Sequence, residues 1–144
     1  MQLEVKYATE EMMNFFNSNP FNIKRDLKNN GIKLEEEKEQ IVKGIAAQIL
    51  LGYGRKQCIE LFSCKVKQNK SLKIVMAKIK TELDYKGNNK TLRSICLIDE
   101  VKNYCIILHI YSKNNKEDLS QSEKNMTKKM FKQYCEVFYG GEIK

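Results

Sequence analysis

Three runs of aliphatic and β-branched residues follow one another in the second half of the chain, separated by gaps of turn length. The runs are Leu72–Leu83, Leu92–Ile98 and Tyr104–Tyr111. The gaps hold Gly87-Asn-Asn89 and Asp99–Asn103, which have the composition and length of a turn and a hairpin. This pattern predicts three consecutive antiparallel strands, and it restricts the fold to classes built around a sheet.

The first half of the chain supplies one more strand and several helices. Leu3–Tyr7 alternates apolar and polar residues, as a half-buried strand does. A short helix is predicted after Thr9, and a second one begins at Asn19-Pro20 and ends at Asn30-Gly31. The longest helix is predicted from Leu34 to Leu51. Further helical turns over Arg55–Cys64 would bury Ile59, Leu61 and Phe62.

A last amphipathic helix begins at Ser120 or Ser122 and ends at Gly140-Gly141. Its inward side is predicted to hold Met126, Met130, Phe131, and Tyr134 or Val137. The whole pattern predicts an α+β fold. An antiparallel sheet of one amino-terminal strand and three late strands carries helices on one face, with the other face partly open, and ends in a helix. We expect one domain over residues 1–144, with a helical region over about residues 9–64.

Length and composition exclude several classes of protein. A chain of 144 residues suits one domain, and no segment approaches the roughly 18 apolar residues of a membrane span. The start of the chain lacks the layout of a signal peptide, so a cytoplasmic protein without membrane contact is expected. The five cysteines form no Cys-x-x-Cys pair and are interpreted as buried apolar residues. With one histidine, a histidine-rich metal site is excluded, and neither a metal nor another cofactor is predicted.

The net charge of +8 favours a polyanionic partner, either nucleic acid or an acidic protein segment. Lysines greatly outnumber acids between Lys65 and Lys90, whereas acids and bases are about balanced up to Glu60. A lysine-rich composition can also reflect genome bias, so charge alone does not decide the function.

The strand at Tyr104–Tyr111 carries the strongest candidate site, because it holds the single histidine, His109. Strict alternation places His109 on the same face as Cys105, Ile107 and Tyr111. Lys113 follows where the strand ends. The alternative is a packed core histidine that has no role in chemistry.

A family resemblance rests on three stretches: Leu92-Arg-Ser-Ile-Cys-Leu-Ile98, Ile106-Ile-Leu-His-Ile-Tyr-Ser-Lys113 and Asp118-Leu-Ser-Gln-Ser-Glu123. Over residues 72–137 the chain resembles the RelE/HigB-like toxins of bacterial toxin–antitoxin systems. The resemblance implies a metal-independent endoribonuclease that cleaves messenger RNA, often on the ribosome, and that a small antitoxin protein holds in check. In that chemistry the ribose 2′-hydroxyl attacks the adjacent phosphate.

The resemblance implies a role for each candidate residue. Arg93 and Lys113 would stabilise the charge on the phosphate, and His109 and Tyr111 would transfer protons or stack on a base. Further contacts to nucleic acid would come from Lys78, Lys80 and Lys116.

The chain departs from the family pattern after Tyr111, which puts in doubt any family role filled from that segment, and two other functions stay open beside the ribonuclease. Ser112-Lys-Asn-Asn-Lys116 stands where relatives carry paired basic residues, and Asp118-Leu119 replaces a common Thr-Pro. One alternative is a toxin of the ParE type, which inhibits DNA gyrase and needs no proton-transfer groups. The other is a non-catalytic basic domain that binds nucleic acid or protein. A basic surface above a buried His109 would be the mark of this third function.

Overall fold

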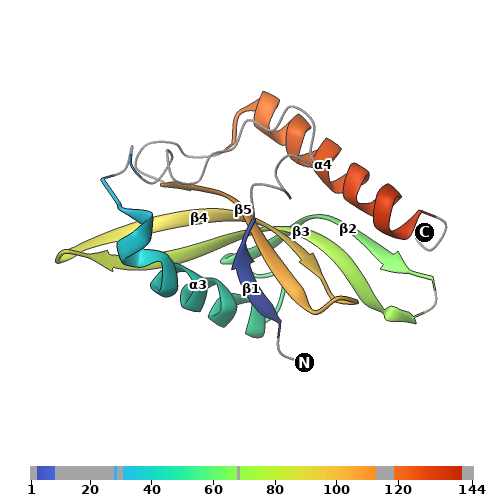
Figure 1. Cartoon of the computed structure of the whole chain (residues 1–144), viewed down its shortest axis with the longest axis horizontal. Helices are drawn as coiled ribbons and strands as arrows, with labels where there is room; N and C mark the ends of the chain where they lie inside the picture. The colour runs from blue at the N-terminus through green and yellow to red at the C-terminus, as the bar shows by residue number, and fades with distance from the viewer. Residues whose placement is uncertain (1–2, 9–27, 29–30, 68, 113–118, 141–144) are drawn as a thin grey trace.

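The computed structural model describes residues 3–8, 28, 31–67, 69–112 and 119–140, and Figure 1 shows their arrangement. The elements, in chain order, are β1 (Glu4–Tyr7), α3 (Leu34–Leu50), β2 (Cys58–Val66), β3 (Asn69–Tyr85), β4 (Asn88–Asp99), β5 (Tyr104–Ser112) and α4 (Gln121–Tyr139). The predicted α+β class is confirmed. The helices predicted after Thr9 and after Asn19 lie outside the described residues.

The sheet has five strands in the order β1-β5-β4-β3-β2. Strands β2 to β5 form an antiparallel series of neighbours, and β1 pairs in parallel with β5 at one edge. The prediction of four strands was one short, because Cys58–Val66 forms β2 instead of the helical turns expected over Arg55–Cys64. The pairing of β2 with β3 shifts between Glu60 and Phe62. Such a bulge interrupts the alternation that identifies a strand in a sequence.

The two described helices cover opposite faces of the sheet, as Figure 1 shows, with α4 above it and α3 below. The expectation that the helices share one face was therefore wrong. Alternate residues of each strand enter two separate cores, so Ile74 and Met76 lie under α4 while Val75 and Ala77 face α3. A sheet buried on both faces needs long apolar strands, which explains the continuous hydrophobic runs of the sequence.

Helix α3 packs closely on β3. Ile41 and Ile45 are buried, and a Cβ atom added at Gly44 would lie 3.4 Å from Cγ2 of Thr81. Three acids in the first turn, Glu35, Glu36 and Glu37, complement the partial positive charge of the helix start. The predicted helix and the observed one agree within one residue.

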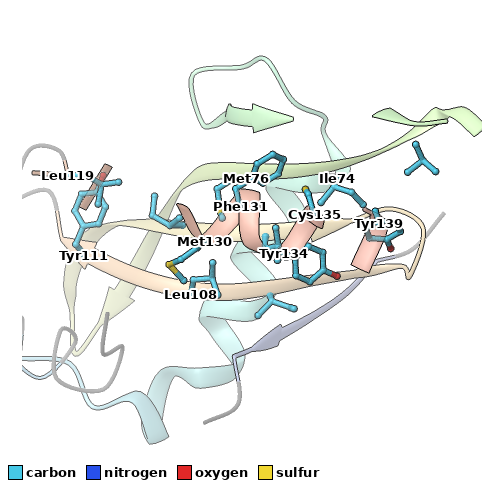
Figure 2. Close-up of a cluster of buried hydrophobic side chains, with 14 residues drawn as sticks. Ile74, Met76, Leu108, Tyr111, Leu119, Met130, Phe131, Tyr134, Cys135 and Tyr139 are labelled. Carbon is cyan, nitrogen blue, oxygen red and sulfur yellow. The ribbon is translucent and has the colours of Figure 1, made fainter. Parts of the chain in front are cut away.

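Helix α4 begins with a capping box. The hydroxyl of Ser120 accepts a hydrogen bond from the backbone N–H of Glu123, and the Glu123 carboxylate accepts one from the N–H of Ser120. The helix ends at Gly140, as predicted. Figure 2 shows its buried side, which includes Met130, Phe131 and Tyr134, packed on Met76 and Leu108. Val137 is 60% exposed, so Tyr134 takes the inward position that the sequence left open between the two.

No helix within the described part of the chain is long and apolar enough to cross a membrane. All five cysteines are free. Two of them meet across the interface between β2 and α4, where the Sγ atoms of Cys64 and Cys135 lie 3.4 Å apart.

Candidate functional site

Five of the candidate residues lie together on the sheet face that α4 covers. Lys80 pairs with Arg93, and Arg93 pairs with Tyr111, so these three form one row across β3, β4 and β5. Lys78, Ile95 and His109 form the adjacent row in the same way. Directly paired residues of neighbouring strands share a face, at a spacing of about 4.8 Å between strands. The predicted grouping of these residues on one face is therefore observed. We call the two rows the basic rows.

A β-bulge in β5 places His109 in this group. Ile95 pairs with His109 while the next residue, Cys96, pairs with Ile107, so Leu108 is the extra residue of β5. Cys105 and Ile107 consequently belong to the core under α3, whereas Tyr111 belongs to the core under α4. The expectation that His109 shares a face with Cys105 and Ile107 was wrong. The expectation that it shares one with Tyr111 was right.

His109 and Tyr111 are buried, each residue being 4% exposed. Their rings are stacked, with centroids 5.5 Å apart and planes inclined by 26°. Nε2 of His109 lies 3.5 Å from Oε2 of Glu123, so a protonated imidazole would form an ion pair there. Figure 2 places Tyr111 beside Leu119, at the start of α4. In this arrangement a ligand on the sheet surface reaches neither ring.

The three cations of the basic rows are half-buried. Lys78, Lys80 and Arg93 each keep part of the side chain accessible. Long basic side chains commonly cover apolar surface with their stems and hold the charge at the rim. The next pair along these strands is Glu82 and Thr91, which brings an acidic and a neutral side chain. The hydroxyl of Thr91 donates to Oε2 of Glu82 at 2.9 Å. The positive charge therefore ends at this row.

Helix α4 adds two lysines that the sequence analysis did not single out. Phe131 contacts Phe62 of β2, with ring centroids 6.0 Å apart, which orients that side of the helix toward β2 and β3. Lys128 and Lys124 precede Phe131 by three and seven residues, so they lie along the same side of α4, and both are exposed. The sequence did contain a signal for them: Lys124, Lys128 and Phe131 are spaced four, three and seven residues apart, as residues on one side of a helix are.

Two of the candidate residues, Lys113 and Lys116, lie outside the described residues. Within the described ranges, no three His, Cys, Asp or Glu side chains lie close enough together to hold a metal ion.

A second polar cluster, also missed by the sequence analysis, lies at the far end of α4. The fully buried carboxylate of Asp99 accepts hydrogen bonds from the hydroxyls of Tyr134, at 2.6 Å, and Tyr139, at 2.5 Å. It also accepts one from the backbone N–H of Lys102 at 2.9 Å. The hydroxyls of Tyr104 and Tyr134 are 2.5 Å apart. Because all four partners of this network join α4 to the β4–β5 hairpin, its role is to fix the helix on the sheet.

The comparisons with known proteins identify no relative. No protein-family model, no curated protein and no solved structure matches this chain.

Proposed function

We propose that this protein binds single-stranded RNA through the basic rows and the neighbouring side of α4, without cleaving it. The observation that carries the proposal is the combination of half-buried cations on adjacent strands with a histidine that is only 4% exposed. A group that moves a proton in catalysis must come within hydrogen-bond distance of the substrate. Cations that contact phosphates need only reach the surface.

The spacing of the cations suits a ligand with many regular charges. Neighbouring positions in the basic rows are about 4.8 Å apart across strands and about 6.8 Å apart along a strand. Lys124 and Lys128 extend the array onto the helix. A nucleic-acid strand presents one phosphate for about every 3.4 Å of rise, so several cations can contact one strand at once. With both aromatic rings buried, we expect phosphate contacts and little preference for base sequence.

The test is the salt dependence of RNA binding. Fluorescence anisotropy with a labelled oligouridylate should give a linear fall of log affinity with log salt, at about 0.7 per phosphate contact. Replacing Lys78, Lys80 and Arg93 together by Ala should reduce that slope by about 2. Lys43→Ala, on the exposed side of α3, is a control for the loss of a surface lysine elsewhere on the protein and should change nothing. An unchanged slope in the triple variant would contradict the proposal.

A second candidate is the metal-independent ribonuclease implied by the RelE/HigB resemblance, with a small antitoxin as its partner. One observation favours it: Arg93, Tyr111 and His109 lie together, and a carboxylate, Glu123, lies beside the histidine. Such a group contains a cation for the phosphate and a proton-transfer pair. For catalysis, the start of α4 would have to move away from His109.

Two measurements distinguish the candidates: the growth of cells that express the protein, and the mapping of cleaved messenger RNA in those cells. The ribonuclease predicts toxicity and message cleavage that both His109→Gln and Arg93→Ala abolish. The binding protein predicts uncleaved messages and RNA affinity that His109→Gln leaves intact. The ParE-type alternative predicts that the protein inhibits DNA supercoiling by gyrase. Neither of the other two functions predicts this inhibition.

A further inference from the structure

A pocket of about 600 Å³ lies on the other side of the sheet, between β1 and the second half of α3. Its walls are mainly aliphatic, and the polar side chains among the lining residues are those of Tyr53 and Glu100. The lining residues are Leu3, Val5, Ala46, Ala47, Ile49, Leu50, Tyr53 and Glu100. This volume and this composition are typical of sites that hold small organic molecules.

The carboxylate of Glu100 is held in a fixed position. Oε1 accepts a hydrogen bond from the backbone N–H of Lys73 at 2.8 Å, and Oε2 lies 3.4 Å from the hydroxyl of Tyr53. The Lys73 ammonium pairs with Glu60 instead and lies 5.0 Å from the centre of the Tyr53 ring. Among the described residues, no cation forms an ion pair with Glu100. Within the part of the chain that the structure describes, this apolar pocket therefore contains one carboxylate that hydrogen bonds orient and no ion pair neutralises.

The wall formed by α3 is fixed in position as well. The guanidinium of Arg55 donates to the backbone oxygens of Gln48, at 2.7 Å, and Gly52, at 3.0 Å. These contacts satisfy carbonyl groups at the carboxyl end of the helix. The described residues leave the mouth of the pocket apolar, because Leu50 is 81% exposed. A ligand with an apolar body thus meets a preformed wall, at little cost in ordering the protein.

We propose that this pocket binds an amphipathic organic cation, with its ammonium group on Glu100 and its apolar body between β1 and α3. Charge complementarity selects this occupant. The chain as a whole carries a charge of +8, which repels cations, so the local acid at an apolar site is the specific attraction. An anionic ligand of the same shape would meet both the Glu100 carboxylate and an apolar wall, and would be excluded.

The test uses three ligands that differ only in the head group: n-octylammonium, n-octanol and octanoate, with binding measured by isothermal titration calorimetry. Octylammonium should bind about tenfold to hundredfold more tightly than octanol, which is the range expected for hydrogen bonds to a charged group. Octanoate should bind most weakly. Equal affinities for octylammonium and octanol in the wild-type protein would overturn the proposal without any variant.

Two variants with the same change in net charge make the test specific. Glu100→Gln keeps the size of the side chain and an acceptor for the N–H of Lys73, and it should weaken octylammonium binding at least tenfold while leaving octanol binding unchanged. Glu39→Gln, at an exposed position of α3, should leave both affinities unchanged. Octylammonium affinity that survives in Glu100→Gln would refute the assignment.

Sedimentation equilibrium tests the main competing occupant, a second copy of this chain. A dimer that Leu50→Glu dissociates would mean that the apolar mouth is a subunit interface, and the ligand proposal would fall. A monomer that binds octylammonium supports it. RNA binding uses the opposite face of the sheet, so either proposal can fail while the other stands.

Discussion

The buried carboxylate of Asp99 gives the sharpest test of how α4 is attached to the sheet. Its two oxygens accept three hydrogen bonds, two from the hydroxyls of Tyr134 and Tyr139 and one from the N–H of Lys102. Asp99→Asn keeps the shape of the side chain and removes one acceptor oxygen. With the amide oxygen toward the tyrosines, the amide NH2 group faces the N–H of Lys102, so two donors oppose each other.

The size of the effect follows from the bonds that are lost. A hydrogen bond to a charged group contributes about 1.5–3 kcal/mol, and an orphaned buried donor costs about 1–3 kcal/mol. Removing the charge recovers part of the cost of burying a carboxylate, which reduces the total. We expect the free energy of unfolding to fall by about 3 kcal/mol.

Urea unfolding followed by circular dichroism measures this loss. With a denaturant slope of about 2–3 kcal/mol/M, the midpoint should move down by about 1 M. Asp84→Asn, at an exposed position of β3, is the control and should stay within about 0.5 kcal/mol of the wild type. A loss below about 1 kcal/mol in Asp99→Asn would show that the three hydrogen bonds do not hold α4 in place.

Two further measurements follow from the same helix. Burial, together with the hydrogen bond to Asp99, raises the pKa of Tyr134. The folded state therefore keeps this proton when the unfolded chain loses it, so stability should be complete below about pH 10 and decline above it. Tyr134→Phe should make that decline shallower in urea titrations, and an unchanged decline would contradict this account. Burial also raises the pKa of the Cys64 and Cys135 thiols, so their oxidation should be slow at neutral pH. The thiolate fraction still rises about tenfold per pH unit, so hydrogen peroxide should join the two cysteines faster at pH 9 than at pH 7, two thiols and one peroxide giving a disulfide and two waters; peptide mapping that finds another pairing would refute this.

The elements of the fold were largely predictable, and the main error has a physical cause. The strands around the two late turns and the helix from Leu34 were found because their periodicity is regular. In β2 the bulge adds Leu61 between Glu60 and Phe62. Leu61 and Phe62 then both pack against the core under α4, which breaks the alternation. The spacing of Ile59, Leu61 and Phe62 suited a helix as well as a strand.

The sequence predicted which residues of the candidate site share a face of the sheet, but it did not predict how deeply they are buried. Lys78, Lys80 and Arg93 were placed on one face because alternation holds in β3 and β4. In β5 the residues on both faces are apolar, so the sequence shows no alternation of polar and apolar residues. A shift of that alternation at Leu108, the extra residue of the bulge, therefore cannot be seen. The burial of His109 depends on where α4 lies, which is a tertiary property that no local pattern encodes.

The parallel pairing of β1 with β5 has a consequence for how the chain folds. Strands β2 to β5 join consecutive neighbours, so this part can assemble from contacts between residues close in sequence. Glu4, by contrast, pairs with Tyr104. Closing a loop of about 100 residues costs roughly 4 kcal/mol of chain entropy, which four paired residues repay only when β5 is already in place. We expect β1 to dock last, so during synthesis β1 leaves the ribosome before the other described strands and still pairs after them.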